Sequence, residues 1–380
     1  MTENKTETII YNNESILFGE RNGEYFIESS SEIKDAIKIT DLPNHLLQKV
    51  IILDSINSGA GRQEDKNLYT HVIQPLFELL NVQYDYFATT SPDSINQFAS
   101  NLRESKVTII FISGDTSINE FINGLLSDIQ GSIDIFTIPG GTGNSLALSL
   151  GITNQIESIK HLLISDKIDP LYLYNVKFPQ GSHYLVQNEK KGLINSNLKF
   201  VVVLSWGFHA SLVADSDTPE LRKFGLKRFQ IAAKNNLSRE QEYNGVLKVN
   251  DETIKGPFAY WLLTSSSRFE PTFEISPKGD ILQDNLYFVG FNTKKNDDKY
   301  ILDIMHQIYN EGDHINNKGV IYKKITNEDQ LDLVISESEV FEHRRFCLDG
   351  SIILIPETSD HIKISVGDNK QHNWELSIIH

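Results

Sequence analysis

The sequence predicts a protein in which an α/β domain, built on a mostly parallel sheet flanked by helices, is followed by a β-rich domain. Up to residue 150, apolar β-branched and aromatic runs alternate four times with helical patterns, which is typical of a parallel sheet covered by helices. After about residue 165, strand patterns dominate and long helical periods are few. The length of 380 residues exceeds one ordinary hydrophobic core and suits two domains.

The α/β domain is predicted to span residues 46–160. Each of its strands is a run of β-branched and aromatic side chains bounded by turn residues. In the helix predicted over 91–102, Ser91 is expected to cap the first turn and Pro92 to occupy the first position, where its missing N–H costs no hydrogen bond. The predicted strands span 50–54, 83–89, 107–112 and 133–138.

Two further parts flank this domain. Residues 1–45 carry short alternating apolar segments that predict a small β preamble. Residues 161–380 are predicted to form the β-rich domain, with helices over 218–236 and 299–310. The polar segment 188–192 predicts a loop within it.

Composition excludes several classes of function. The chain has 35 basic and 51 acidic side chains and a net charge of -16, which argues against a broad nucleic-acid-binding face. Cys347 is the single cysteine, so no internal disulfide forms and a reducing compartment is expected. The longest apolar runs are about five residues, against roughly 20 for a membrane span. The expected location is therefore the cytoplasm, and a lipid ligand would require peripheral association with intracellular membranes.

Two glycine-bearing turns organise the first half of the chain. Ser113-Gly114-Asp115 follows the strand predicted over 107–112, and the loop 139–144 follows the strand over 133–138. Each turn then opens a helix. A strand running into a glycine turn and a helix presents backbone N–H groups and the positive helix end to an anion. The pattern indicates an enzyme that handles phosphate groups.

The residues around these turns resemble a known family. The turn at 58–61, the turn at 113–117 with its helix, and the loop 139–147 are similar in order and spacing to the catalytic domain of the diacylglycerol kinase and sphingosine kinase superfamily. That fold also resembles NAD kinase. Further blocks at 205–210, 221–229 and 346–350 resemble sphingosine and ceramide kinases. The resemblance extends from about residue 48 to about residue 357.

The resemblance implies a lipid kinase that uses ATP with Mg²⁺; no metal ligands are identified. The glycine loops would hold the triphosphate through backbone N–H groups, and arginine side chains suit phosphate oxygens. The residues implied to border the nucleotide are Asn57, Ser58, Gly59, Gly61, Thr89, Gly114, Ser117, Gly140, Gly141, Thr142, Gly143, Asn144, Arg222, Arg228 and Asp349.

Asp115 is the candidate catalytic base, because transfer of a phosphoryl group to a hydroxyl needs a carboxylate that receives the proton. The alternative is that Asp115 only caps a helix. Arg222 and Arg228, taken without the surrounding block, would be a solvated helix face. His209 and Cys347 are interpreted as structural, because no metal ligand or nucleophile partner lies at a useful spacing.

Four residues are predicted to contact the lipid: Trp206, Phe208, Ser211 and Asp215. The alternative for the two aromatic side chains is the hydrophobic core. Ser211 falls where the resemblance implies an aspartate that meets the head group in sphingosine kinases, and a serine offers a neutral hydrogen bond in place of a carboxylate. This substitution leaves open whether the lipid is a sphingoid base, a ceramide or a diacylglycerol.

Two departures from the family pattern motivate a competing hypothesis. Thr116 replaces the glycine that usually follows the aspartate, and a β-branched residue resists positive φ and adds bulk. Ser351 replaces an acidic residue near the nucleotide. The leading interpretation is a sphingosine kinase-like enzyme acting on the primary hydroxyl of a sphingoid long-chain base. The competing one is a weakened homologue that binds lipid or a partner and regulates an active kinase.

The predicted partners follow from the leading interpretation. They are a lipid substrate presented at a membrane surface, with a homodimer as a possible further assembly. A kinase for nicotinamide dinucleotides shares the glycine loops but is disfavoured by the sphingolipid-type blocks after residue 200.

Overall fold

The computed structural model describes residues 5–29, 36–59, 61–62, 66–295, 297, 299–336, 339–357, 361–367, 370–371 and 373–380. The chain divides into two compact units. Unit 1 contains Met1–Gly141, Leu150–Pro170 and Gln371–His380, and unit 2 contains Thr142–Ser149 and Leu171–Lys370. The domain limits 46–160 and 161–380 stay a prediction.

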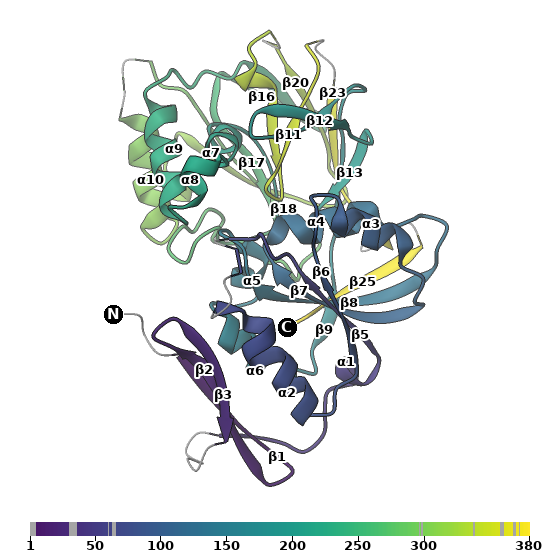
Figure 1. The fold of residues 1–380 in the computed structure, drawn as a ribbon. Helices are drawn as coiled ribbons and strands as arrows, with labels where there is room; N and C mark the ends of the chain where they lie inside the picture. The colour runs from purple at the N-terminus through teal and green to yellow at the C-terminus, as the bar shows by residue number, and fades with distance from the viewer. Residues whose placement is uncertain are drawn as a thin grey trace. The chain divides into compact units, whose positions relative to one another are not determined.

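Unit 1 is built on a sheet of mostly parallel strands, ordered β24-β25-β8-β7-β5-β6 in the described part of the chain, with β9 paired to β25. The pairs β5–β6, β5–β7, β7–β8 and β8–β25 are parallel. Figure 1 shows the yellow β25 from the end of the chain lying beside β8. The strands are β5 (Lys49–Asp54), β6 (Tyr84–Ala88), β7 (Lys106–Ser113), β8 (Gly131–Pro139), β9 (Ile168–Pro170), β24 (Lys370–Gln371) and β25 (Trp374–Ile379).

The helices of unit 1 follow these strands. They are α1 (Asn44–Leu47), the π-helix η2 (Tyr69–Ile73), α2 (Gln74–Leu79), α3 (Ser94–Asn101), α4 (Asp115–Gly124) and α6 (Gln155–Ile164). The predicted start of α3 was wrong by two residues, because the N-cap is Asp93 and not Ser91. The hydroxyl of Ser94 accepts the backbone N–H groups of Thr90 and Ser91 at 3.0 and 2.9 Å, so these residues form a turn before the helix.

Residues 5–29 and 37–39 add a small separate sheet to unit 1. Its order is β3-β2-β1-β4, with β1 (Lys5–Tyr11), β2 (Glu14–Arg21), β3 (Glu24–Ser29) and β4 (Ile37–Ile39). An ion pair of 2.6 Å between Lys160 Nζ on α6 and Glu7 Oε1 on β1 joins this sheet to the rest of the unit.

Unit 2 contains two antiparallel sheets with a common core. One sheet has the order β13-β10-β23-β20-β15-β16 and the other β12-β11-β22-β21-β14-β17-β18-β19. The strands are β10 (Tyr174–Lys177), β11 (His183–Val186), β12 (Glu189–Leu193), β13 (Asn197–Phe200), β14 (Val203–Gly207), β15 (Gly245–Val249), β16 (Glu252–Lys255), β17 (Phe258–Thr264), β18 (Leu286–Asn292), β19 (Val320–Ile325), β20 (Gln330–Ile335), β21 (Arg345–Leu348), β22 (Ser351–Leu354) and β23 (His361–Val366). The expected α/β region with a parallel sheet, followed by a β-rich part, is thereby confirmed.

The predicted loop over 188–192 was wrong, because most of it is β12. Gln187 and Asn188 have φ of 54° and 61° and make a tight turn between β11 and β12. All five residues of β12 are exposed, so the alternating apolar signal of a half-buried strand is missing from them.

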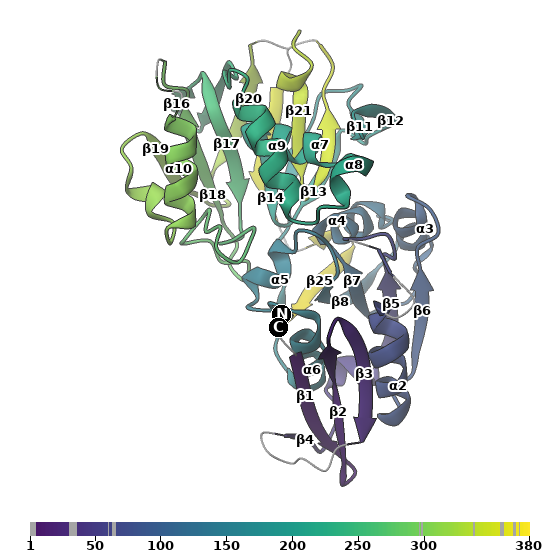
Figure 2. The same ribbon diagram turned by 60° about the vertical axis from the view of Figure 1, so that its left-hand side comes forward.

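Helices cover the outer face of the larger sheet of unit 2, as Figure 2 shows for α7 and α9 in front of β14 and β21. On β14, Leu204 and Trp206 enter the core between the sheets, as do Phe346 and Leu348 on β21. Because side chains alternate along a strand, Ser205, Arg345 and Cys347 face α7. The helices are α5 (Ser145–Ser149), α7 (Phe208–Ser216), α8 (Pro219–Arg222), α9 (Lys227–Leu237), α10 (Tyr300–Tyr309), η3 (Asp313–Asn316) and η4 (Glu342–Arg344).

Among the residues that the structure describes, no helix is long and apolar enough to cross a bilayer.

Candidate functional site

The glycine loops of unit 1 meet at one edge of the parallel sheet. β5, β7 and β8 are parallel neighbours, so their carboxyl ends and the loops that follow lie together. The N–H of Ser55 donates to Ile112 O at 3.1 Å, and the N–H of Gly140 donates to Ser113 O at 2.9 Å. These bonds join the first loop to the end of β7 and the end of β7 to the third loop.

Two glycines of the first loop have backbone conformations that residues with a Cβ atom rarely adopt. Gly59 has φ of +63°, and a Cβ there would lie 2.9 Å from Gly140 O. Gly61 has φ of +77°. Gly59 and Gly140 therefore lie so close together that the backbones leave no room for a larger residue at 59, whereas Gly61 is constrained by its positive φ alone.

A buried ion pair that the sequence did not reveal supports the same loop. Arg62 donates through Nε and one terminal nitrogen to Asp54 Oδ1, at 3.1 and 2.8 Å, and its other terminal nitrogen donates to Ser58 O at 3.4 Å. Burial raises the pKa of the Asp54 carboxyl, and Arg62 and Tyr86 oppose that shift. A signal was present, since Asp54 ends an apolar run that is otherwise uncharged from residue 50 on.

Asp115 is the first residue of α4, at the carboxyl end of β7. Gly114 is the N-cap, with extended φ and ψ of -96° and 178°. Thr116 and the buried Ser117 lie in the first turn of this ten-residue helix, so Thr116 has ordinary right-handed conformation and needs no positive φ. The carboxylate of Asp115 is thus placed at the positive end of α4.

Glu120 follows on the same helix. Its pKa is raised to about 7, first by burial and then by the charge of Asp93. A carboxyl group with this pKa changes its charge near neutral pH.

The predicted residues around the first loop differ in exposure. Thr89 is buried; its Oγ1 accepts the N–H of Ile56 at 3.2 Å and its own N–H donates to Asp54 O at 2.9 Å. Asn57 is exposed, and Ser58 is half-buried with its N–H bonded to Ser55 O. Thr89 therefore shapes the loop from beneath, whereas Asn57 faces solvent.

The third loop is shared by the two units. Gly141 ends its unit 1 part, and Thr142, Gly143 and Asn144 belong to unit 2, where they precede α5. These three residues are half-buried.

Arg222 and Arg228 of unit 2 share one carboxylate. Arg222 donates to both oxygens of Asp217 at 2.8 and 3.2 Å, and Arg228 lies 3.5 Å from Asp217 Oδ1. The bond to Asp217 raises the pKa of Arg222, while burial lowers that of Arg228. Asp217 thus holds the two arginines near each other.

The carboxylate of Asp349 is held by hydrogen bonds from backbone N–H groups. It accepts the N–H groups of Val201, Val202 and Val203 at 2.7, 2.9 and 2.7 Å, and the residue is 3% exposed. This carboxylate fixes the chain where it enters β14.

The predicted lipid-contacting aromatic residues are buried in unit 2. Trp206 is fully buried between the sheets, and its indole N–H donates to His343 O at 2.6 Å. Phe208, at the start of α7, packs near Tyr260 with ring centroids 6.4 Å apart. The alternative interpretation of Trp206 as a core residue matches this position.

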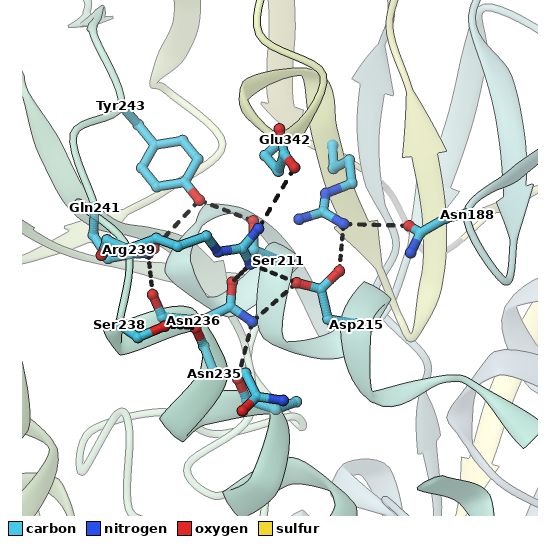
Figure 3. Close-up of polar contacts among 12 residues, drawn as sticks. Asn188, Ser211, Asp215, Asn235, Asn236, Ser238, Arg239, Gln241, Tyr243 and Glu342 are labelled. Carbon is cyan, nitrogen blue, oxygen red and sulfur yellow. Dashed lines mark hydrogen bonds and ion pairs between the residues drawn. The ribbon is translucent and has the colours of Figure 1, made fainter. Parts of the chain in front are cut away.

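Ser211 and Asp215 lie one turn apart on α7. The hydroxyl of Ser211 is buried and lies 2.9 Å from the hydroxyl of Tyr243. Asp215 Oδ1 accepts from Arg345 at 2.6 Å. Asp215 Oδ2 accepts from Arg239 at 2.8 Å and from Asn236 at 3.0 Å, as Figure 3 shows. Burial raises the pKa of Asp215, but the bonds from Arg345, Asn236 and Arg239 outweigh it and leave the pKa below its usual value.

Two further polar groups face α7 from the sheet. Arg345 is 1% exposed, and no sequence pattern singled it out beyond the pair of arginines before the strand at 346. Ser205 Oγ lies 2.7 Å from Nδ1 of His209, whose pKa burial lowers to about 4. His209 is therefore neutral near pH 7.

The fold and the loops define a class of protein. Residues 51–176 match the diacylglycerol kinase catalytic domain. A diacylglycerol kinase structure from Bacillus anthracis str. Sterne superposes with a TM-score of 0.54 at 12% identity, covering 87% of this chain and 96% of that one, which shows a shared fold. The family match of residues 51–176 and the similarity to sphingosine kinases support a relationship of this chain to the diacylglycerol kinase and sphingosine kinase superfamily.

Its curated relatives lie in the sphingolipid branch. Sphingosine kinase B of Dictyostelium discoideum is 36% identical over 122 residues, and sphingosine kinase 1 of Rattus norvegicus 24% over 270. Ceramide kinase of Mus musculus is 25% identical over 231 residues. The matches cover 30%, 64% and 55% of this chain but 16%, 66% and 38% of those proteins, respectively.

Proposed function

We propose that this protein is an ATP-dependent lipid kinase whose acceptor is the primary hydroxyl of a sphingolipid, either a sphingoid long-chain base or its N-acylated form, with diacylglycerol as the alternative. The observation that carries the proposal is the meeting of three glycine loops at the carboxyl ends of β5, β7 and β8, with Asp115 at the start of α4. The sphingosine and ceramide kinase relatives support the lipid class.

The residues at this edge fit a triphosphate. Gly59 and Gly140 let the first and third loops lie in close backbone contact, and the N-terminus of α4 favours negative charge. For Arg222 and Arg228 of unit 2, the contact with phosphate stays a prediction from the family resemblance. ATP supplies the phosphoryl group. The described residues include no cluster of three or more His, Cys, Asp or Glu side chains that could hold a metal, so Mg²⁺ is proposed to enter on the nucleotide.

The proposed chemistry assigns one proton transfer to Asp115. A bond forms between the lipid hydroxyl oxygen and the γ-phosphorus, the bond from that phosphorus to its bridging oxygen breaks, and the hydroxyl proton moves to the Asp115 carboxylate. The lipid is proposed to be reached at a membrane surface by peripheral association.

The test is phosphoryl transfer from labelled ATP to sphingosine, ceramide and diacylglycerol. We expect transfer by the wild-type chain and a loss of about 10²- to 10⁴-fold in kcat for Asp115→Asn, since a positioned base contributes about that factor. Asp128→Asn, which changes an exposed aspartate, serves as the control. Folded wild-type protein that transfers phosphate to none of the lipids would sink the proposal.

A second function, a weakened homologue that regulates an active kinase, is favoured by Thr116. Thr116 is helical, so its resistance to positive φ does not weaken nucleotide binding. The bulk of its side chain is then the remaining reason to expect weak binding. Calorimetry separates the two: a kinase binds ATP, whereas a weakened homologue shows little affinity that Thr116→Gly then increases.

A further inference from the structure

Arg345 brings a charged side chain into the layer between α7 and the larger sheet of unit 2. Its NH1 donates to Asp215 at 2.6 Å and to Asn188 Oδ1 at 3.2 Å. Its Nε and NH2 atoms are buried and have no hydrogen-bond partner among the described residues. Buried donors in folded proteins are nearly always paired. The arrangement therefore suits an acceptor that none of the described residues provides.

The charges around Arg345 indicate what kind of acceptor fits. Asp215 faces two guanidinium groups, those of Arg345 and Arg239, and Arg239 also lies 3.5 Å from Glu342 (Figure 3). The charges of these two guanidinium groups and of the Asp215 and Glu342 carboxylates thus already cancel. An uncharged oxygen completes this network, whereas an added phosphate, carboxylate or ammonium would unbalance it in a buried place.

The same network leaves little for an ammonium group to bind. The oxygens of Asp215 accept from Arg345, Arg239 and Asn236, and Ser211 is bonded to Tyr243. A protonated amine here would lie beside two guanidinium groups that share one carboxylate. Like charges at such distances disfavour binding.

The side chains beside Arg345 are apolar. Those that fill the layer under α7 are Leu185, Ala210, Ala214, Cys347, Ile352 and Leu354. The partly buried Phe341 packs against this cluster, with its ring centroid 5.9 Å from Arg345 Cζ. A neutral oxygen embedded in hydrocarbon, as in an acyl group, matches one buried fork of donors in an apolar layer.

We propose that Arg345 is a specificity-determining residue that donates from Nε and NH2 to the acyl carbonyl oxygen of the lipid, so that the chain prefers N-acylated or O-acylated lipids over a free sphingoid base. This inference rests on the proposed function and names its substrate class.

The test measures lipid binding by calorimetry in mixed micelles, with short-chain ceramide, short-chain diacylglycerol and sphingosine as probes. We expect the wild-type chain to bind an acyl lipid at least about tenfold more tightly than sphingosine, the difference that two net hydrogen bonds produce. Arg345→Lys keeps the charge beside Asp215 and loses the fork, so acyl-lipid affinity falls about tenfold and sphingosine affinity does not change. Arg344→Lys is the matched control, because Arg344 donates to Ile355 O and Glu357 instead.

The outcomes separate the two levels of the proposal. Sphingosine binding as tight as acyl-lipid binding, or an equal loss for both lipids in Arg345→Lys, would overturn the role of Arg345. If Arg345→Lys fails to fold, Arg345→Gln replaces it, with the same selective loss expected. Acyl-lipid binding without phosphoryl transfer refutes the proposed kinase activity and retains the recognition by Arg345. In the active enzyme we expect Arg345→Lys to raise KM for acyl lipids and leave kcat unchanged, and the ceramide and diacylglycerol arms identify which carbonyl is recognised.

Discussion

The described residues of each unit include an aspartate–arginine pair with a largely buried arginine, Asp54–Arg62 in unit 1 and Asp215–Arg345 in unit 2, and these two pairs differ in how completely the arginine is bonded. In unit 1 all three nitrogens of Arg62 donate, to Asp54 and to the carbonyls of Ser58 and Ile112. In unit 2 Arg345 donates through NH1, and its Nε and NH2 have no partner among the described residues. Both arginines are largely buried, with side chains 11% and 2% exposed.

The difference separates two uses of the same ion pair. Asp54–Arg62 is a closed pair, in which every nitrogen of the arginine donates a hydrogen bond. Such a pair fixes the loop around it, and no donor stays unbonded. A pair with unbonded donors, such as Asp215–Arg345, is less favourable for folding by itself and suits recognition of a ligand. The pair in unit 1 therefore supports its loop, and the pair in unit 2 is the one proposed to determine lipid specificity.

The largest expected effect comes from breaking the closed pair. Arg62→Met leaves the fully buried Asp54 without its partner, so we expect a loss of about 3–5 kcal/mol in the free energy of unfolding. Urea denaturation measures it. Lys49→Met, which breaks an exposed ion pair with Asp85, is the control, with an expected loss below about 1 kcal/mol. A similar small loss in Arg62→Met would show that the pair does not stabilise the loop.

Breaking the Asp215–Arg345 pair should lower the free energy of unfolding by a smaller amount. In Arg345→Met the carboxylate of Asp215 keeps Arg239 and Asn236, and two unpaired buried donors are removed, so we expect a loss of about 1–3 kcal/mol. The same denaturation experiment checks it. A loss as large as that of Arg62→Met would abolish the distinction between the pairs.

The smallest expected effect is a difference in the sign of the pH dependence. Asp215 has a pKa below the ordinary 3.8, so its contribution is present above 3.8 and is lost as the pH falls through the folded pKa. Asp54 has a pKa raised by burial, so its contribution is present below 3.8 and is lost as the pH rises through the folded pKa.

Replacing each aspartate by asparagine reveals this difference. On acidification, Asp215→Asn should lose stability less steeply than the wild type, and Asp54→Asn more steeply, by about 1 kcal/mol or less across the acid range. Unfolding free energies measured from pH 3 to 6 check the slopes. Slopes that change in the same direction would contradict the comparison.

The parts of the fold that depend on local pattern were predictable from sequence. The strands at 50–54 and 107–112 are apolar runs apart from Asp54 and Thr108, and the glycine turn at 113–115 follows its strand directly. The start of α3 and the strand β12 were not predictable, because a serine side chain decides the first and an exposed polar hairpin carries no apolar period.

Some residues of the candidate site could likewise be predicted from the sequence, and others could not. The glycine loops could be predicted because each is a short segment with a recognisable pattern. Arg345 could not, because its contact with Asp215 joins residues 130 positions apart, and the facing of Arg345 depends on the register of β21 against β14. The lipid contact of Asp215 stays a prediction, and the cations that surround its carboxylate could not be read from the sequence.

The last strand has a consequence for the order in which the chain folds. β25 pairs with β8 along Gly131 to Ile135, and a Cβ on Gly131 would lie 2.4 Å from the Trp374 ring. During synthesis, about 230 residues must leave the ribosome between β8 and β25, at roughly 5–20 residues per second. The nascent sheet of unit 1 therefore exposes an unpaired edge at β8 for on the order of ten seconds or more, a period in which chaperones or aggregation partners can compete for it.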